Sequence, residues 1–195
     1  MMSGEPIFSI GIDQSQRGFG VSMISSEDGK VYGTTTCAAD KGNYKEQSER
    51  FYELLTDVKA WIDPMRYNYG RHNNIIVCRE DHSFQQYGHA SANLEIAGMI
   101  DFMFQSQYGL VPGKTLFKCL PNVWMSWFKV KKPKREAPKK RKGGETDEQF
   151  AARRPSIVFD PNAYAVMYPT LGNDEHQIDA SFLAFAGIKL RAQEK

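Results

Sequence analysis

Three acidic residues stand at the ends of predicted elements, far apart along the chain. Asp13 closes an apolar run at 7–13, Glu80 follows the apolar run 75–78, and Asp179 lies in the first turns of a C-terminal helix. Clustered carboxylates repel each other unless cations neutralise them, and their oxygens suit Mg²⁺ or Mn²⁺. If the three side chains meet, they predict a site for two divalent ions that hydrolyses phosphodiesters with an activated water.

Taken singly, each acid has an ordinary structural explanation. An Asp at the end of a strand often belongs to a turn, and an acid near a helix N-terminus is stabilised by the helix dipole. The functional interpretation therefore rests on the set of three, in this order and on these elements.

His176 precedes Asp179 by three residues, so both side chains share one face of the final helix. An imidazole beside a metal-bound carboxylate can bind Mn²⁺, hold the scissile phosphate or manage the proton of the attacking water. The sequence leaves these three roles open.

The segment 129–142 is intensely basic, with nine basic residues and one acid, and its charge of +8 leaves −6 on the rest of a chain whose total is +2. This asymmetry indicates a polyanionic partner, most often nucleic acid, although a solvated loop or a targeting tract has the same composition. Prolines and a Gly-Gly pair interrupt the segment, so we expect no fixed structure there without a ligand. The candidate DNA-binding residues are Lys129, Lys131, Lys132, Lys134, Arg135, Lys139, Lys140, Arg141 and Lys142.

The order of predicted elements indicates an α/β fold. Three strands joined by short turns within 7–37 form an antiparallel meander, and two further strands are expected at 75–78 and 115–120. Helical periodicity at 44–63 and 90–107 separates these strands. The pattern predicts a mixed five-stranded sheet flanked by helices.

The remaining helices are predicted from their start and stop signals. Pro64 is expected to end the first helix, and Pro121 and Pro161 to begin short ones. Residues 145–154 can form a further short helix, and Asn173 or Asp174 caps the last one. We expect a single domain over 1–195 with a basic, flexible insertion at about 129–154.

The composition is typical of a globular protein that does not span a membrane. Hydrophobic residues make up 41% and charged residues 25% of the chain, with no apolar run of the roughly 20 residues that span a bilayer. The first residues lack a basic start followed by an apolar stretch, so we expect a cytoplasmic protein of a bacterium or a phage-infected cell.

The acidic positions lie in segments that resemble the RuvC-type Holliday junction resolvases, nucleases of the RNase H-like superfamily. The runs 10–13 (IGID) and 18–21 (GFGV) resemble the first motif of that family, although Gln14-Ser15 replaces its usual Pro-Gly. Residues 77–81 (VCRED) resemble the second motif, and 176–180 (HQIDA) the last. The resemblance spans roughly residues 7–190.

The resemblance implies an RNase H-like fold and a crossover junction endodeoxyribonuclease. Asp13, Glu80, His176 and Asp179 would bind two Mg²⁺ or Mn²⁺ ions and carry out catalysis. Lys118 would contribute to catalysis or DNA contact, and an aromatic residue after the catalytic Glu would help to open the junction. Phe84 is that aromatic residue, but it stands four residues after Glu80 and three after Asp81, so Asp81 stays open as an alternative ligand.

A four-way DNA junction is matched by a symmetric dimer with two active sites, and the helix at about 90–108 is the candidate interface. Two alternative functions remain: a less selective RNase H-like nuclease acting on branched or flapped DNA, and a non-catalytic DNA-binding relative. An actin-like ATP-binding fold also begins with a strand that ends in Asp, but it usually needs a longer chain.

Overall fold

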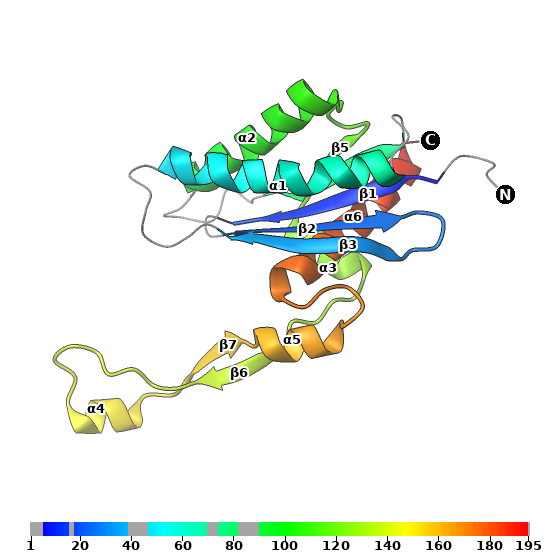
Figure 1. The fold of residues 1–195 in the computed structure, drawn as a ribbon. Coiled ribbons are helices and arrows are strands. Elements are labelled where there is room, and N and C mark those ends of the chain that lie inside the picture. Colours follow the sequence, from blue (N-terminus) through cyan, green and yellow to red (C-terminus); the bar gives the residue numbers. More distant parts are fainter. Residues whose placement is uncertain (1–5, 16–17, 39–46, 70–73, 82–89, 195) are drawn as a thin grey trace.

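Five strands form one mixed sheet in the computed structural model, which describes residues 6–15, 18–38, 47–69, 74–81 and 90–194 (Figure 1). The order across the sheet is β3-β2-β1-β4-β5; β3, β2 and β1 pair antiparallel, whereas β1–β4 and β4–β5 pair parallel. The predicted fold class is confirmed. The strands are β1 (Phe8–Gln14), β2 (Gly18–Ser25), β3 (Val31–Ala38), β4 (Ile75–Glu80) and β5 (Leu116–Cys119).

Helices cover both faces of this sheet. Figure 1 shows α1 (Gln47–Tyr69) and α2 (Ala90–Tyr108) on one face, and α3 (Pro121–Trp127), α5 (Pro161–Met167) and α6 (Glu175–Gln193) on the other. Side chains alternate along a strand, so Ile10 and Ile12 enter the core under α1 and α2. Ile76 and Cys78 enter the second core, under α6.

Helix α6 lies unusually close to β1. A Cβ atom on Gly11 would stand 1.8 Å from the carbonyl oxygen of Ala180 and 2.5 Å from the amide nitrogen of Ala184, both in α6. A Cβ atom on Gly187, also in α6, would stand 2.6 Å from the side-chain oxygen of Ser9 in β1. Small residues on both surfaces therefore let the helix backbone touch the strand.

The prediction that Pro64 ends the first helix is wrong, because α1 continues through it to Tyr69. A proline inside a helix removes one hydrogen bond to the carbonyl four residues earlier. Here that carbonyl belongs to Ala60, and both residues are exposed, so water can replace the lost donor. Ile62 is buried and Met65 half-buried on either side of Pro64, which favours continuation of the helix.

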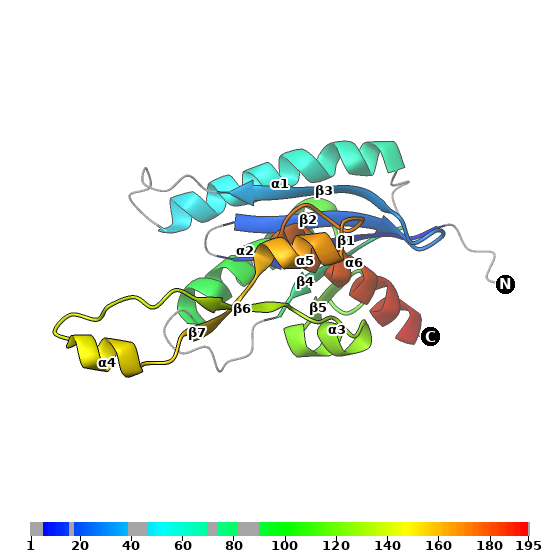
Figure 2. The ribbon, with the colours of Figure 1, turned by 90° about the horizontal axis from the view of Figure 1, so that it is seen from below.

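A two-stranded ribbon projects from the body, and the sequence did not predict it. Strands β6 (Lys134–Ala137) and β7 (Ser156–Phe159) pair antiparallel, with the short helix α4 (Asp147–Ala152) beyond them (Figure 2). Thr146 caps α4 in a reciprocal capping box with Gln149. We call residues 129–160 the arm. The expectation of no fixed structure at 129–142 is wrong for the four residues of β6.

Two further features of the described chain bear on the protein class. None of its helices combines the length and the apolar character that crossing a bilayer requires. Cys37, Cys78 and Cys119 are buried and form no disulfide with one another, and burial raises the pKa of the Cys37 and Cys119 thiols to about 11. The three thiols are therefore packing residues.

Candidate active site

The first turn of α6 brings His176 onto Asp13 at the end of β1. Asp174 caps the helix, and its carboxylate accepts hydrogen bonds from the amide of Gln177 at 2.9 Å and from the hydroxyl of Thr36 in β3 at 2.7 Å. Nδ1 of His176 then lies 2.7 Å from Oδ2 of Asp13. This hydrogen bond, opposed by burial, raises the pKa of His176 to about 9, so the imidazole is cationic at neutral pH.

Glu80 ends β4, the strand parallel to β1, and its side chain lies on the same face of the sheet as Asp13. The main-chain carbonyl of Glu80 accepts hydrogen bonds from Nε2 of Gln14 at 2.5 Å and from Nη1 of Arg79 at 2.8 Å, which fixes the strand end. Burial, and then repulsion from Asp13 and Asp179, raise the pKa of the Glu80 carboxyl to about 8. The negative charges of both other predicted acids therefore act on the Glu80 carboxyl.

Asp179 uses both of its carboxylate oxygens in hydrogen bonds to residues outside the sheet. Nζ of Lys132, at the base of the arm, lies 2.5 Å from Oδ2, and the hydroxyl of Tyr164 in α5 donates to Oδ1 at 2.8 Å. The Asp179 side chain is 8% exposed. Burial, and then the charge of Asp13, raise its pKa to about 6 against the opposing effect of Lys132.

The structure thus brings Asp13, Glu80, Asp179 and His176 to one face of the sheet, at the carboxyl ends of two neighbouring parallel strands. It adds Lys132 and Tyr164, which the sequence analysis did not connect with these acids. Lys132 was one of nine similar basic residues, and no local pattern distinguished it from the others. Tyr164 follows Pro161 in a helix that was predicted, but its contact with Asp179 depends on the tertiary fold.

Two solved structures are similar to this chain over nearly its whole length. Thermus thermophilus RuvC in complex with a Holliday junction substrate is 14% identical, with a TM-score of 0.58 and 96% of each chain covered. A second Thermus thermophilus RuvC structure is 13% identical, with a TM-score of 0.57 and the same coverage. The chain has the RuvC fold. Its sequence matches no family model and no curated protein.

The RuvC fold of this chain places Lys118 on the opposite face of the sheet from the three acids. Its ammonium group lies 2.9 Å from Oδ2 of Asp101 in α2, and Arg79, its partner in the β4–β5 register, binds both oxygens of Asp101 at 2.7 and 2.9 Å. Lys118 is therefore not brought into the cluster with Asp13 and Glu80.

Glu80 and Asp81, the two acids at the end of β4, lie on opposite faces of the sheet. The Asp81 side chain is 44% exposed and lies 3.9 Å from Nη1 of Arg79, on the side of the sheet that α1 and α2 cover. This placement favours Glu80 as the member of the acidic cluster. Phe84, the aromatic residue that the resemblance implied for DNA contact, lies outside the described residues.

The nine basic residues at 129–142 do not share one environment. Lys132 is at the acidic cluster, Lys139 donates to the carbonyl of Ala151 at 3.1 Å, and Arg141 pairs with Asp147 at the tip of the arm. Seven are exposed, so most of the +8 charge faces solvent. These seven are Lys129, Lys131, Lys134, Arg135, Lys140, Arg141 and Lys142.

The chemistry of the cluster fits hard divalent cations. Asp13, Glu80 and Asp179 supply only oxygen ligands, and the raised pKa values of Glu80 and Asp179 show that these buried groups ionise at a cost that a cation would relieve. Within the described ranges, no three acidic, imidazole or thiol side chains are already grouped to enclose an ion. Instead, Asp13 is paired with His176 and Asp179 with Lys132, so ion binding requires these side chains to rearrange.

The raised pKa values predict how stability depends on pH. Glu80, Asp179 and His176 each hold a proton more tightly in the folded chain, so each contributes stability at low pH that is lost as the pH rises through its raised value, between about pH 5 and 9. We expect the Tm to fall from pH 5.5 to 8.5. Adding Mg²⁺ should raise the Tm more at pH 8.5 than at pH 5.5.

Differential scanning calorimetry at both pH values, with and without Mg²⁺, checks this prediction. Glu80→Gln is the matched variant, because it removes the largest of these carboxyl shifts and should flatten the fall in Tm. A wild-type Tm that stays level over this range, or a Glu80→Gln slope equal to that of the wild type, would contradict it.

Proposed function

We propose that this protein is a structure-selective DNA endonuclease that resolves four-way junctions by metal-dependent phosphodiester hydrolysis. The observation that carries the proposal is the placement of Asp13, Glu80 and Asp179 on one face of a RuvC-type sheet, at the carboxyl ends of β1 and β4 and the start of α6. The solved relative in complex with a Holliday junction supports the same substrate class for this chain.

Each residue of the cluster has a distinct part in this function. Asp13, Glu80 and Asp179 would hold two Mg²⁺ or Mn²⁺ ions, which when bound supply an activated water and stabilise the leaving oxygen. His176 is cationic because of its contact with Asp13, so it is suited to donate a hydrogen bond to the scissile phosphate or a proton to the leaving oxygen. Tyr164 holds one oxygen of Asp179 and thereby orients that carboxylate.

Cleavage of four-way, three-way, flap and plain duplex DNA side by side, with Mg²⁺ and with Mn²⁺, tests the proposal. We expect the four-way junction to be cut in preference and the plain duplex to be left intact. Equal cleavage of flaps and three-way junctions would favour the less selective nuclease, and binding of branched DNA without cleavage would favour a non-catalytic relative.

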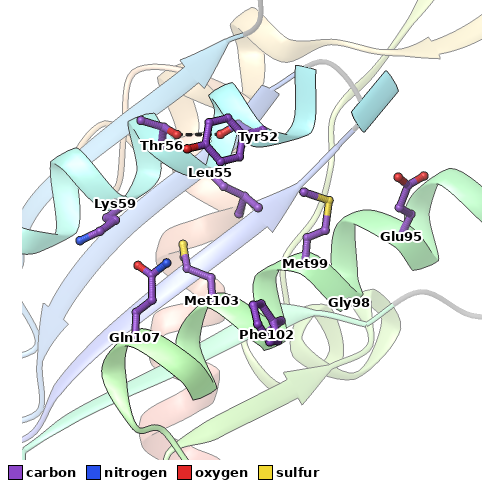
Figure 3. A pocket seen from close by; sticks show the side chains of 10 residues that line it. All are labelled: Tyr52, Leu55, Thr56, Lys59, Glu95, Gly98, Met99, Phe102, Met103 and Gln107. Atoms are coloured by element: carbon purple, nitrogen blue, oxygen red, sulfur yellow. Dashed lines mark hydrogen bonds between the residues drawn. The ribbon is translucent and has the colours of Figure 1, made fainter. Parts of the chain in front are cut away.

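The groove between α1 and α2 supports the proposal of a homodimer. It encloses about 730 Å³, and Leu55, Met99 and Met103 line it (Figure 3). Phe102 in α2 is 72% exposed, and a Cβ atom on Gly98 would meet nothing within 4 Å. An open apolar helix surface of this kind suits a second copy of the chain, and the mass in solution tests it. A strict monomer would favour the less selective nuclease.

The exposed basic residues of the arm predict a strong salt dependence of DNA binding. Each phosphate that a Lys or Arg neutralises releases counterions, so affinity falls steeply as salt rises. Replacing the seven exposed residues at 129–142 with Ser or Gln should weaken junction binding by at least about tenfold at 100 mM salt and flatten the slope of log K against log salt. Fluorescence anisotropy over a salt series measures both quantities.

Lys132 and Lys139 stay unchanged in this variant, because both side chains are half-buried. A control variant replaces three basic residues on the body of the protein, Lys30, Lys59 and Lys114, and it should leave the slope nearly unchanged. If the arm variant keeps the wild-type slope, the arm is not the DNA contact.

A further inference from the structure

Lys132 differs from every other basic residue at 129–142 in what surrounds its charge. Its Nζ atom lies 2.5 Å from Oδ2 of Asp179, and the side chain is only 32% exposed. Three aromatic rings surround the same atom, with ring centroids at 5.9 Å for Trp124, 5.3 Å for Phe159 and 5.5 Å for Tyr164. A surface contact to DNA would need none of these features.

The surroundings of Lys132 are fixed by the base of the arm. Phe159 ends β7 and pairs with Lys134 in the ribbon register, and the amide of Asp160 donates to the carbonyl of Pro133 at 2.9 Å. Lys132 therefore lies at the base of the arm, next to the point where β6 and β7 come together. Tyr164 in α5 is fully buried, and its ring packs edge-on against that of Phe159, with the ring centroids 5.4 Å apart.

Both oxygens of Asp179 are consequently engaged, but by different kinds of donor. Tyr164 offers a neutral hydroxyl to Oδ1, whereas Lys132 offers a full positive charge to Oδ2. A divalent cation that approaches Oδ2 meets the ammonium group directly, and like charges a few ångströms apart repel strongly where water is largely excluded. Repulsion therefore opposes the binding of a divalent ion to this oxygen while the ammonium group stays at hydrogen-bonding distance.

We propose that Lys132 is a built-in competitor of the metal: its ammonium group holds the Asp179 oxygen that a divalent ion would use, so that ion binding displaces it within the aromatic cage of Trp124, Phe159 and Tyr164. This inference rests on the proposed function of the acidic cluster. It assigns Lys132 to the control of metal affinity rather than to the DNA-binding surface. Because Phe159 belongs to the arm, the displacement takes place at the arm's own base.

Mg²⁺ titrations of the full chain by isothermal calorimetry at pH 8.5 test the proposal without any cleavage assay. Lys132→Met removes the charge and keeps an unbranched side chain in the cage, and it should lower the Kd for Mg²⁺ by at least about tenfold. Lys132→Arg keeps the charge and should retain weak binding close to that of the wild type. Lys131→Met, at an exposed neighbouring position, is the matched control for loss of one positive charge and should leave the Kd nearly unchanged.

A second readout follows the cage itself. Mg²⁺ should change the tryptophan fluorescence of the wild type, because the cation near the Trp124 ring moves, and this change should be absent from Lys132→Met and from Trp124→Phe. An unchanged or higher Kd in Lys132→Met would overturn the inference, as would an equal effect of Lys131→Met.

The outcomes separate the inference from the proposed function. If the wild type binds Mg²⁺ and cuts junctions while Lys132→Met binds with the same Kd, only the inference fails. If Mg²⁺ binds to Lys132→Met but is too weak to detect in the wild type, the competition is supported. If neither binds Mg²⁺ and Asp179→Asn behaves as they do, both the inference and the metal-dependent function fail.

Discussion

Replacing Asp13 with Asn is expected to lower the rate of junction cleavage by about 10³-fold or more while the fold is kept. The carboxylate at this position would be one of three that hold the ions, and the substitution removes a negative charge without changing the side-chain shape. A loss of that size corresponds to about 4 kcal/mol of transition-state stabilisation, within the several kcal/mol that metal ions supply to phosphoryl chemistry. Single-turnover cleavage of a labelled four-way junction with Mg²⁺ measures it.

Asp81→Asn is the matched control for this experiment, because it makes the same chemical change at an acid on the other face of the sheet. We expect Asp81→Asn to retain cleavage within about threefold of the wild type, since that side chain is exposed and lies beside Arg79 rather than Asp179. Circular dichroism of both variants checks that the fold is retained. Near-normal cleavage by Asp13→Asn would remove this carboxylate from the reaction, and a severe loss in Asp81→Asn would restore Asp81 as a ligand.

The acidic cluster could be anticipated from the sequence because its members stand at element ends that the topology brings together. Strands β1 and β4 are parallel neighbours, so Asp13 and Glu80 end at the same edge of the sheet. The final helix was recognisable from a cap at Asn173 or Asp174, of which the structure has Asp174, and His176 and Asp179 share a face of it. Local patterns placed each residue on one strand or one helix, and the resemblance to the RuvC-type family implied the topology that brings these elements together.

The contacts of the arm could not be anticipated in the same way. Lys132 and Tyr164 reach Asp179 from segments that are 47 and 15 residues away along the chain. The prolines and the Gly-Gly pair in the basic segment predicted no fixed structure there, whereas pairing of β6 with β7 depends on exposed residues such as Ile157 and Val158, which carry no periodic signal. Lys118 shows the converse limit: its residue type fitted the family, but its ammonium group pairs with Asp101 on the other face of the sheet, which no local pattern indicated.

Two glycines determine whether the helix that carries His176 and Asp179 can reach the strand that carries Asp13. A Cβ atom at Gly11 would lie 1.8 Å from the carbonyl oxygen of Ala180, and one at Gly20 would lie 2.0 Å from that of His176. Both obstacles are backbone atoms of α6, so no side-chain rotation can relieve them. The geometry of the site therefore depends on these positions having no side chain.

Gly11→Ala should accordingly destabilise the protein by about 4 kcal/mol or more, beyond the 1–3 kcal/mol typical of an overpacked core and a large share of the total stability of a domain. The better strand propensity of alanine offsets little of this. Gly98→Ala, in the open groove face of α2, should instead stabilise by up to about 1 kcal/mol, because nothing obstructs its Cβ atom and alanine favours the helix. Urea unfolding of both variants compares the two effects. If Gly11→Ala unfolds at the wild-type urea concentration, α6 does not lie against β1 as closely as this structure has it, and the approach of Asp179 to Asp13 loses its main support.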